Sequence, residues 1–289
     1  MVIANNPKLR CYAKITVLTV LTVLVAAATL ELADYRAQSQ IDEALAERLP
    51  DAIKQVQAQQ EEAALKAERE SVLASWAAAP AQVPEGRHIY GSLSAQFTLV
   101  EFSDLECPYC KRFHDTPKTL VDQSGGKLNW EWWHYPLAFH SPGAMLGAQA
   151  AECVAELAGN QAFWAFTGEW FEHSQMNGGG VEDAEQLAQL VGAPADGFKQ
   201  CLASEKYKAK IEQQLAKGTE LGVTGTPATF VVDNMTGNRV LVRGTQTPQV
   251  LLEAMKQAIG MRDAPPSQGN PPAPAEASST VPEAQAKRQ

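Results

Sequence analysis

The sequence predicts an α/β protein in which a long helical block separates two groups of β-strands. Short segments in which apolar and polar residues alternate, as they do in strands, lie before and after this block. Between them, from 141 to 218, apolar residues recur at helical spacing. A last helix is expected to run to about Gly260, because Thr247 can cap it and Pro248 suits its first turn. The expected strands are 97–103, 128–135, 228–232 and 239–243.

Composition and charge exclude several classes of protein. The chain has 289 residues, of which 45% are hydrophobic and 20% charged, and its net charge is −9. This length is enough for one large or two modest domains with cores of their own. The acidic balance lacks the basic excess that binding to a phosphate backbone requires, so we expect no nucleic-acid partner. Five cysteines are too few for a disulfide scaffold, so their positions must be examined one by one.

The N-terminus has the features of a membrane anchor or an export signal. Basic residues in 1–14 precede an apolar segment at 15–33 that contains no charge before Glu31. This charge order keeps the N-terminus in the cytoplasm and places the rest of the chain in the periplasm. An uncleaved inner-membrane anchor and a signal peptide cleaved after the alanines at 26–28 both fit the pattern. Cys11 precedes the apolar segment, and we interpret it as an unpaired cytoplasmic thiol.

Residues 34–76 are expected to form a helical extension, because they are rich in Ala, Gln, Glu and Lys and contain no Gly. Pro50 predicts a break at Leu49, with a second helix that begins at Asp51. The large apolar residues form a stripe too narrow for a globular core, so the segment is either a solvated spacer or a surface for homo-oligomerisation. The stripe consists of Ile41, Leu45, Leu49, Ile53 and Val56.

Two further segments have the composition of loops. Residues 77–86 are rich in proline and alanine, which predicts a linker. Residues 263–289 contain six prolines and almost no large apolar residue, which predicts a disordered tail. The folded domain is therefore expected at 87–262.

The strongest chemical signal is the motif Cys107-Pro108-Tyr109-Cys110, between a predicted strand and a predicted helix that runs to about Val121. Unpaired N–H groups and the helix dipole at this point stabilise a thiolate at Cys107. Cys110, one turn further, is expected to be shielded and to act as the resolving thiol. The alternatives are an inert disulfide or half of a zinc site, but no further cysteines or histidines have metal-ligand spacing, so we expect no metal.

A second motif, VTGTP at 223–227, precedes the strand at 228–232. Together with the CxxC motif it resembles the thioredoxin superfamily, in which a cis-proline loop lies opposite the active cysteines. The resemblance implies that Pro227 is cis and that Thr226 offers its backbone to an extended substrate. It also implies that Pro108 and Tyr109 contribute to substrate binding.

Glu101 lies six residues before Cys107, where the same superfamily keeps a buried acid beneath the CxxC motif. Burial raises the pKa of a carboxyl group, which would suit Glu101 to take the proton of Cys110. The alternative is a strand residue that faces solvent. Asp104 and Glu106 are expected at the exposed rim, where Glu106 would oppose the Cys107 thiolate.

The spacing of the two motifs indicates the type of family member. Cys107 and Pro227 are 120 residues apart, which leaves room for a helical insertion. The segments FSDLECPYCKRFH and WHYPLAFHSPGA are similar to those of DsbA-like proteins, over about 87–262. This resemblance implies a thioredoxin-like fold with an inserted all-helical domain at about 141–218. It also implies thiol–disulfide exchange on exported cysteine-containing proteins, a membrane redox partner that recycles the CPYC pair, and no external cofactor.

Cys153 and Cys201 fall near the two ends of the insertion. Several DsbA-like proteins carry a second disulfide at such positions, so the resemblance implies a structural bond here. Two free buried thiols are the alternative.

The direction of exchange stays open between an oxidase, an isomerase and a reductase, and a fourth hypothesis is a protein without catalytic activity. The DsbA-like insertion favours a dithiol oxidase. The CPYC dipeptide, Thr226 before Pro227 and a self-associating extension favour a disulfide isomerase. A non-catalytic thioredoxin-like chaperone would use the same groove to hold extended chains.

Overall fold

The computed structural model describes the backbone of residues 7–262 and the side chains of 18–262. The predicted tail at 263–289 and the side chain of Cys11 lie outside these residues. The chain divides between Lys66 and Ala67 into two units. The first unit consists of most of one helix, and the second contains the sheet and all other helices.

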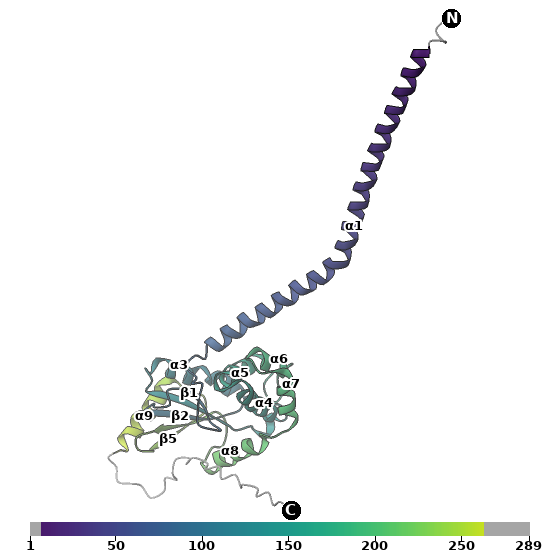
Figure 1. Ribbon diagram of the computed structural model, residues 1–289. Coiled ribbons are helices and arrows are strands. Elements are labelled where there is room, and N and C mark those ends of the chain that lie inside the picture. Colours follow the sequence, from purple (N-terminus) through teal and green to yellow (C-terminus); the bar gives the residue numbers. More distant parts are fainter. Residues whose placement is uncertain (1–6, 263–289) are drawn as a thin grey trace, which may run out of the picture. The chain divides into compact units, whose positions relative to one another are not determined.

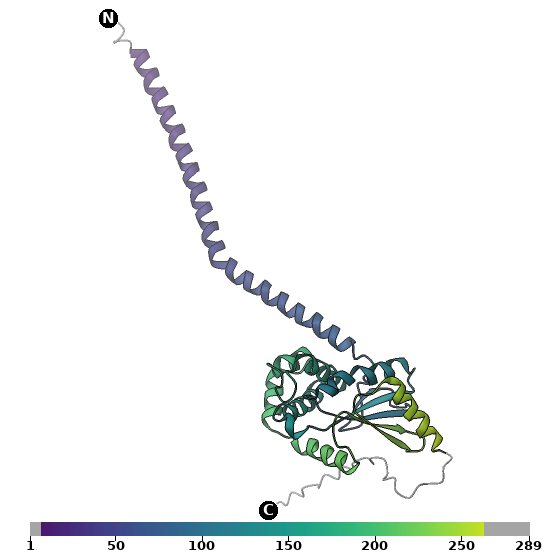
Figure 2. The same cartoon turned by 180° about the vertical axis from the view of Figure 1, so that it is seen from behind.

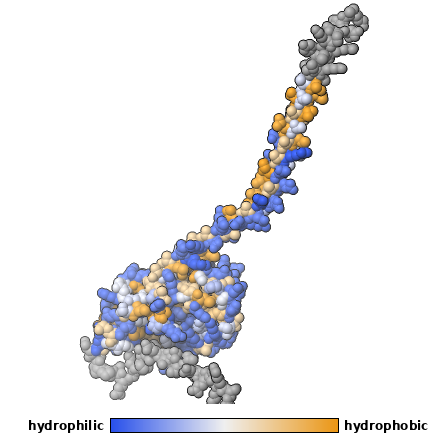
Figure 3. Space-filling model, viewed as in Figure 1, coloured by the Kyte–Doolittle hydropathy of each residue, from blue (hydrophilic) through white to orange (hydrophobic). Residues whose placement is uncertain are grey.

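Helix α1 (Pro7–Ala74) continues through Pro50, so the predicted break at Leu49 and the second helix from Asp51 are wrong. Proline removes one N–H group from the helix, and α1 bends in its middle part without ending there (Figure 1 and Figure 2). This is the one helix, within the described residues, that is long and apolar enough to cross a membrane. Figure 3 shows apolar residues gathered along its N-terminal part.

The second unit is built around a sheet of five strands, counted over residues 7–262, in the order β1-β3-β2-β4-β5 (Figure 1). β2 and β3 are parallel, and the other neighbouring pairs are antiparallel. The sequence analysis missed β1, because four residues are too few to show a clear alternation. The strands are β1 (His88–Gly91), β2 (Phe97–Ser103), β3 (Leu128–His134), β4 (Ala228–Asp233) and β5 (Arg239–Arg243).

Helices α3 and α9 pack on the sheet, α8 packs against β3 and the smaller core, and α4 to α7 gather beside the sheet (Figure 1 and, from behind, Figure 2). This is the predicted thioredoxin-like architecture with a helical insertion. The predicted helix after the CPYC motif is two helices that meet at His114. The helices are α2 (Pro108–Phe113), α3 (Asp115–Gln123), α4 (Gly143–Ala158), α5 (Asn160–His173), α6 (Ala184–Leu190), α7 (Ala195–Ala203), α8 (Lys208–Glu220) and α9 (Pro248–Gly260), with a 3-10 turn η1 (Ala138–His140) before α4.

Strand β2 is buried along its whole length, and its side chains alternate between two cores. Leu99 belongs to the larger core, which also contains both cysteines of the CPYC motif. Val100 and Phe102 belong to the smaller core on the other face. Because side chains alternate along a strand, Glu101 and Ser103 share the face of Leu99 and point into the core that holds the cysteines.

The predicted linker at 77–86 forms neither helix nor strand, and it lies against the domain. Trp76, just before it, is only 5% exposed. The carbonyl of Ala78 accepts a hydrogen bond from the Gly91 amide at 3.0 Å. A segment of small residues such as Ala and Pro can pack along a surface without a periodic pattern of apolar residues, so the sequence does not reveal the contact. The compact unit that holds the sheet starts at Ala67, so the last part of α1 belongs to it.

Replacing Trp76 with alanine is expected to destabilise the domain by about 3–5 kcal/mol, because a large buried ring is lost. The ring packs on Tyr90 and Trp164, with centroids 5.3 and 5.9 Å away. Denaturant unfolding of the full chain measures this loss. Leu49→Ala is the control, since Leu49 is 52% exposed and its loss should change little. Equal effects of the two substitutions would contradict the packing role of Trp76.

Candidate active site

The CPYC motif lies where β2 ends and α2 begins. Cys107 is the N-cap residue of α2, and Pro108 is the first residue of the helix. Cys107 is 3% exposed and Cys110 is fully buried, and both thiols are free. Tyr109 is 57% exposed, and its carbonyl accepts a hydrogen bond from the Thr245 hydroxyl at 2.9 Å. Tyr109 is therefore the part of the motif that faces solvent.

The two thiols of the motif have pKa values shifted in opposite directions. The pKa of Cys107 is lowered to about 6, chiefly because the Cys110 thiol donates a hydrogen bond to its sulfur. Burial opposes this shift, and the Thr226 side chain and two backbone N–H groups add to it. The pKa of Cys110 is raised well above its ordinary value, because burial disfavours its thiolate. When both cysteines are reduced, the pair therefore carries a single negative charge, on the sulfur of Cys107.

The loop before β4 brings a proline next to this sulfur. The peptide bond between Thr226 and Pro227 is cis. The Cys107 thiol donates a hydrogen bond to the carbonyl oxygen of Thr226, with sulfur and oxygen 3.6 Å apart. The two motifs that are 120 residues apart in sequence therefore meet in the structure. An extended peptide that pairs with the backbone of this loop would lie beside the Cys107 sulfur.

Glu101 is 1% exposed, and it points into the core beneath the motif. Neither of its carboxyl oxygens has a hydrogen-bond partner among the described residues. Burial raises the pKa of this carboxyl to about 8. Ser103 and Trp130, as hydrogen-bond donors toward the carboxyl group, oppose this shift, whereas the charge of Cys107 adds to it. Glu101 therefore carries a proton at neutral pH and can exchange it with a neighbouring group.

The expectation that Asp104 and Glu106 lie at the exposed rim is wrong, because both are buried. Asp104 accepts hydrogen bonds from the Glu106 amide at 2.8 Å and from the Leu137 amide at 3.0 Å. His140 Nδ1 lies 2.7 Å from the same carboxyl. Burial raises the pKa of Asp104, and these hydrogen bonds oppose the shift. Asp104 thus holds the turn between β2 and α2 in place.

Glu106, next to Cys107, ties the active-site turn to the helical insertion. Its Oε1 accepts hydrogen bonds from Trp170 Nε1 at 2.8 Å and from the Ser174 hydroxyl at 2.7 Å. Its Oε2 accepts from the amides of Gly178 and Gly180 at 3.1 and 3.0 Å. Sequence reasoning missed this role, because all four donors are more than 60 residues away and no local pattern shows them.

A cluster of potential metal ligands lies apart from the cysteines. His88, His134 and Glu152 are buried, and their ligand atoms lie within 4.8 Å of one another. However, Lys210 Nζ lies 2.7 Å from the Glu152 carboxylate, where its charge takes the place of a cation. Trp132 Nε1 donates to His134 Nδ1 at 3.1 Å, so His134 Nε2 keeps its proton when the ring is neutral. We therefore interpret the cluster as an ionic contact between the sheet and the insertion.

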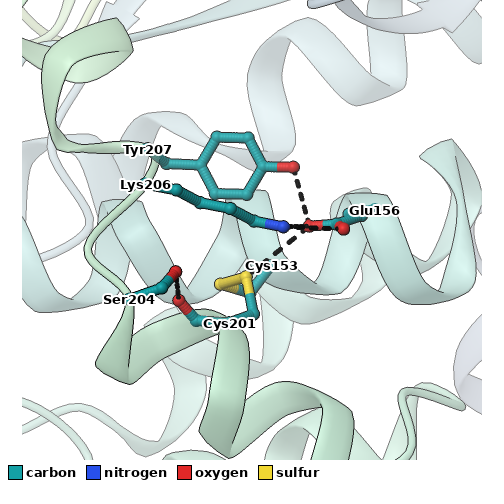
Figure 4. The surroundings of a disulfide bond; sticks show 6 residues. All are labelled: Cys153, Glu156, Cys201, Ser204, Lys206 and Tyr207. Carbon is teal, nitrogen blue, oxygen red and sulfur yellow. Dashed lines mark hydrogen bonds and ion pairs between the residues drawn. A yellow bond between two sulfur atoms is a disulfide. The ribbon is translucent and has the colours of Figure 1, made fainter. Parts of the chain in front are cut away.

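Cys153 and Cys201 form a disulfide that joins α4 to α7, with Cα atoms 5.8 Å apart (Figure 4). Beside it, the Glu156 carboxylate accepts hydrogen bonds from Lys206 Nζ at 2.7 Å and from the Tyr207 hydroxyl at 2.9 Å. The bond links two helices of the insertion to each other. Both of its cysteines are distant from the CPYC motif in the sequence.

Replacing Glu106 with glutamine is expected to destabilise the protein by roughly 2–4 kcal/mol, because an amide group would face two of the four donors and leave them unpaired. Hydrogen exchange should also become faster at the amides of Gly178 and Gly180. Glu172→Gln is the matched control, since the Glu172 side chain is 73% exposed. Unchanged exchange at both glycines in Glu106→Gln would contradict the anchoring role of Glu106.

Comparison with known proteins agrees with this geometry. The family Thioredoxin_4, described as Thioredoxin, matches residues 83–247, which is more than half of the chain. Among solved structures, DsbA2 of Pseudomonas aeruginosa is 29% identical, with a TM-score of 0.50 over 61% of this chain and 96% of that chain. BdbD of Bacillus subtilis is 22% identical, with a TM-score of 0.50 over 63% and 98%, which is a likeness of fold alone.

Curated relatives include much longer proteins. The chain is 31% identical over 151 residues to the Na(+)/H(+) antiporter NhaA 3 of Salinispora tropica, and 30% identical over 186 residues to the Na(+)/H(+) antiporter NhaA of Herminiimonas arsenicoxydans. These matches cover 51% and 63% of this chain but only 22% and 28% of the antiporters. The chain thus spans about a quarter of the length of these relatives. On the family match over 83–247, the chain belongs to the thioredoxin family, and its structural neighbours are DsbA-like.

Proposed function

We propose that this protein is a thiol–disulfide oxidoreductase that oxidises dithiols of protein substrates through Cys107 and Cys110. The observation that carries the proposal is the pair of opposite pKa shifts at two thiols next to a cis-proline loop. A stabilised thiolate beside a protonated thiol is the arrangement that thiol–disulfide exchange requires.

The reaction begins with the oxidised pair. A substrate thiolate attacks the Cys107 sulfur, the Cys107–Cys110 bond breaks, and Cys110 leaves and takes up a proton. A second substrate thiolate then attacks the substrate sulfur of the mixed disulfide, and Cys107 leaves as a thiolate. The substrate gains a disulfide and the pair gains two electrons. A thiol of low pKa leaves faster, so the lowered pKa of Cys107 favours this second step.

Stabilisation of the Cys107 thiolate also supports oxidation as the main direction. It lowers the free energy of the reduced pair, which makes the disulfide a stronger oxidant.

The alternative is a disulfide isomerase. The exposed apolar stripe of α1 favours it, because a homo-oligomer formed through Ile41 to Val56 would present several active sites to one substrate.

Substrate binding is proposed at the two loops that border Cys107. An extended segment of the substrate would pair with the backbone of Thr226 and Pro227. Pro108 and the exposed ring of Tyr109 would contact it from the other side. Backbone pairing is independent of side chains, so this mode suits an enzyme that accepts many exported cysteine-containing proteins.

We further propose that α1 anchors the protein in the inner membrane, with the catalytic domain in the periplasm. The length and apolar character of α1 support an anchor. The disulfide between Cys153 and Cys201 supports an oxidising compartment. A membrane redox partner would then reoxidise the CPYC pair after each cycle.

Cys107→Ser is expected to abolish the oxidation of a reduced protein substrate, because the sulfur that forms the mixed disulfide is lost. In Cys110→Ser, Cys107 can still attack a substrate disulfide, and the resulting mixed disulfide is expected to accumulate because the motif no longer holds a second thiol to resolve it. Refolding of a reduced, disulfide-containing substrate measures the first effect, and non-reducing electrophoresis measures the second.

Cys11→Ser is the control for these variants and should behave like the wild type. Mixed disulfides formed by Cys107→Ser, or none formed by Cys110→Ser, would contradict the mechanism. The same refolding assay decides the direction. Faster action on a reduced substrate than on one with scrambled disulfides supports the oxidase, and the opposite order supports the isomerase.

A further inference from the structure

The loop between β5 and α9 forms hydrogen bonds with both motifs of the active site. It follows Arg243, the last residue of β5, and ends where α9 begins at Pro248. Gly244 has a φ of +73°, in the left-handed region that favours glycine. The chain turns sharply at this glycine, and the polar groups on its two sides reach different partners.

One side of the loop holds the cis-proline loop. The Gly244 amide donates a hydrogen bond to the Pro227 carbonyl oxygen at 2.8 Å. Arg243 donates from Nη2 to the Gly222 carbonyl oxygen at 3.2 Å. Gly222 directly precedes the VTGTP motif and Pro227 ends it. Both ends of this motif are therefore attached to the same short segment.

The other side of the loop holds the CPYC motif through Thr245. The Thr245 hydroxyl donates a hydrogen bond to the Tyr109 carbonyl oxygen at 2.9 Å, across 136 residues of sequence. Thr245 is exposed, so water could serve its hydroxyl equally well and the bond adds little to stability. An exposed hydroxyl that binds the active-site backbone instead points to a role in geometry.

The gap between the two motifs decides where a bound substrate lies relative to the reactive sulfur. The Cys107 sulfur is 3.6 Å from the Thr226 carbonyl oxygen. A substrate that pairs with the cis-proline loop is held by one side of this gap and attacks the other side. Displacement of a held reactant by about 1 Å can cost about a hundredfold in rate. A small dithiol is not held by the loop, so it approaches Cys107 at any width of the gap.

We propose that Thr245 is a positioning residue for extended protein substrates, because it ties the CPYC motif to the segment that holds the cis-proline loop. The inference rests on the proposed function and deepens it, since it concerns how a protein substrate is aligned with Cys107. Without the hydroxyl the two motifs are free to separate, and a substrate paired with Thr226 is no longer aligned. Thr245 bonds the motif at Tyr109, so the chemistry of the Cys107 sulfur stays the same.

The test compares Thr245→Val, which lacks the hydroxyl, with Thr245→Ser, which keeps it. The oxidised full chain reacts with a reduced extended peptide that carries a pair of cysteines, or with dithiothreitol. In both reactions the dithiol becomes a disulfide and the Cys107–Cys110 bond is reduced, which acid quenching and alkylation measure. Thr245→Val should react about tenfold more slowly with the peptide and at the wild-type rate with dithiothreitol. Thr245→Ser should react like the wild type with both.

Thr247→Val is the matched control. Thr247 belongs to the same loop and is also exposed, and within the described residues its hydroxyl does not cap α9 with a hydrogen bond. This variant should react like the wild type with both dithiols. Equal slowing of Thr245→Val with the peptide and with dithiothreitol, or no slowing with the peptide, would overturn the proposal.

Hydrogen exchange in the protein without substrate separates positioning from a direct contact of Thr245 with the peptide. The Gly244 amide should exchange faster in Thr245→Val, because its bond to Pro227 loses the neighbouring attachment at Tyr109. Unchanged exchange at Gly244 would overturn the positioning role. Failure of the oxidase proposal would appear elsewhere, in the refolding assay of the wild type.

Discussion

The turn between β2 and α2 has to hold a reactive sulfur in one position, and buried carboxyl groups on both sides of it supply that constraint. Asp104 binds the amides of Glu106 and Leu137, and Glu106 binds four donors from the insertion. Cys107 follows directly and lies against the Thr226 carbonyl. The sheet, the insertion and the cis-proline loop therefore meet at this turn, and the reactivity of Cys107 depends on how firmly it is held.

The buried acids around the motif have different hydrogen-bond partners, and they therefore have different roles. Glu106 accepts hydrogen bonds with both oxygens, which makes it a structural anchor. Glu101 has no partner among the described residues, and its raised pKa keeps it protonated near neutral pH. Glu101 therefore adds no charge to the reduced site near neutral pH, where the Cys107 thiolate is the stabilised charge of the thiol pair.

Sequence patterns predicted the parts of the site that local rules determine. The resemblance to the thioredoxin superfamily correctly predicted a buried Glu101 and a cis bond before Pro227. The anchoring role of Glu106 was missed, because its partners come from distant segments. Trp76 was placed outside the domain, since one aromatic residue at the end of an alanine-rich helix shows no periodicity. Pro50 was expected to end a helix that in fact continues through it.

The stabilised thiolate of Cys107 is the central claim, and its titration tests that claim most directly. Ultraviolet absorbance of the thiolate in the reduced full chain, with the Cys107→Ser variant subtracted, gives the pKa of this residue alone. The account predicts a midpoint at about 6. A midpoint near the ordinary cysteine value of about 8.5 would contradict it.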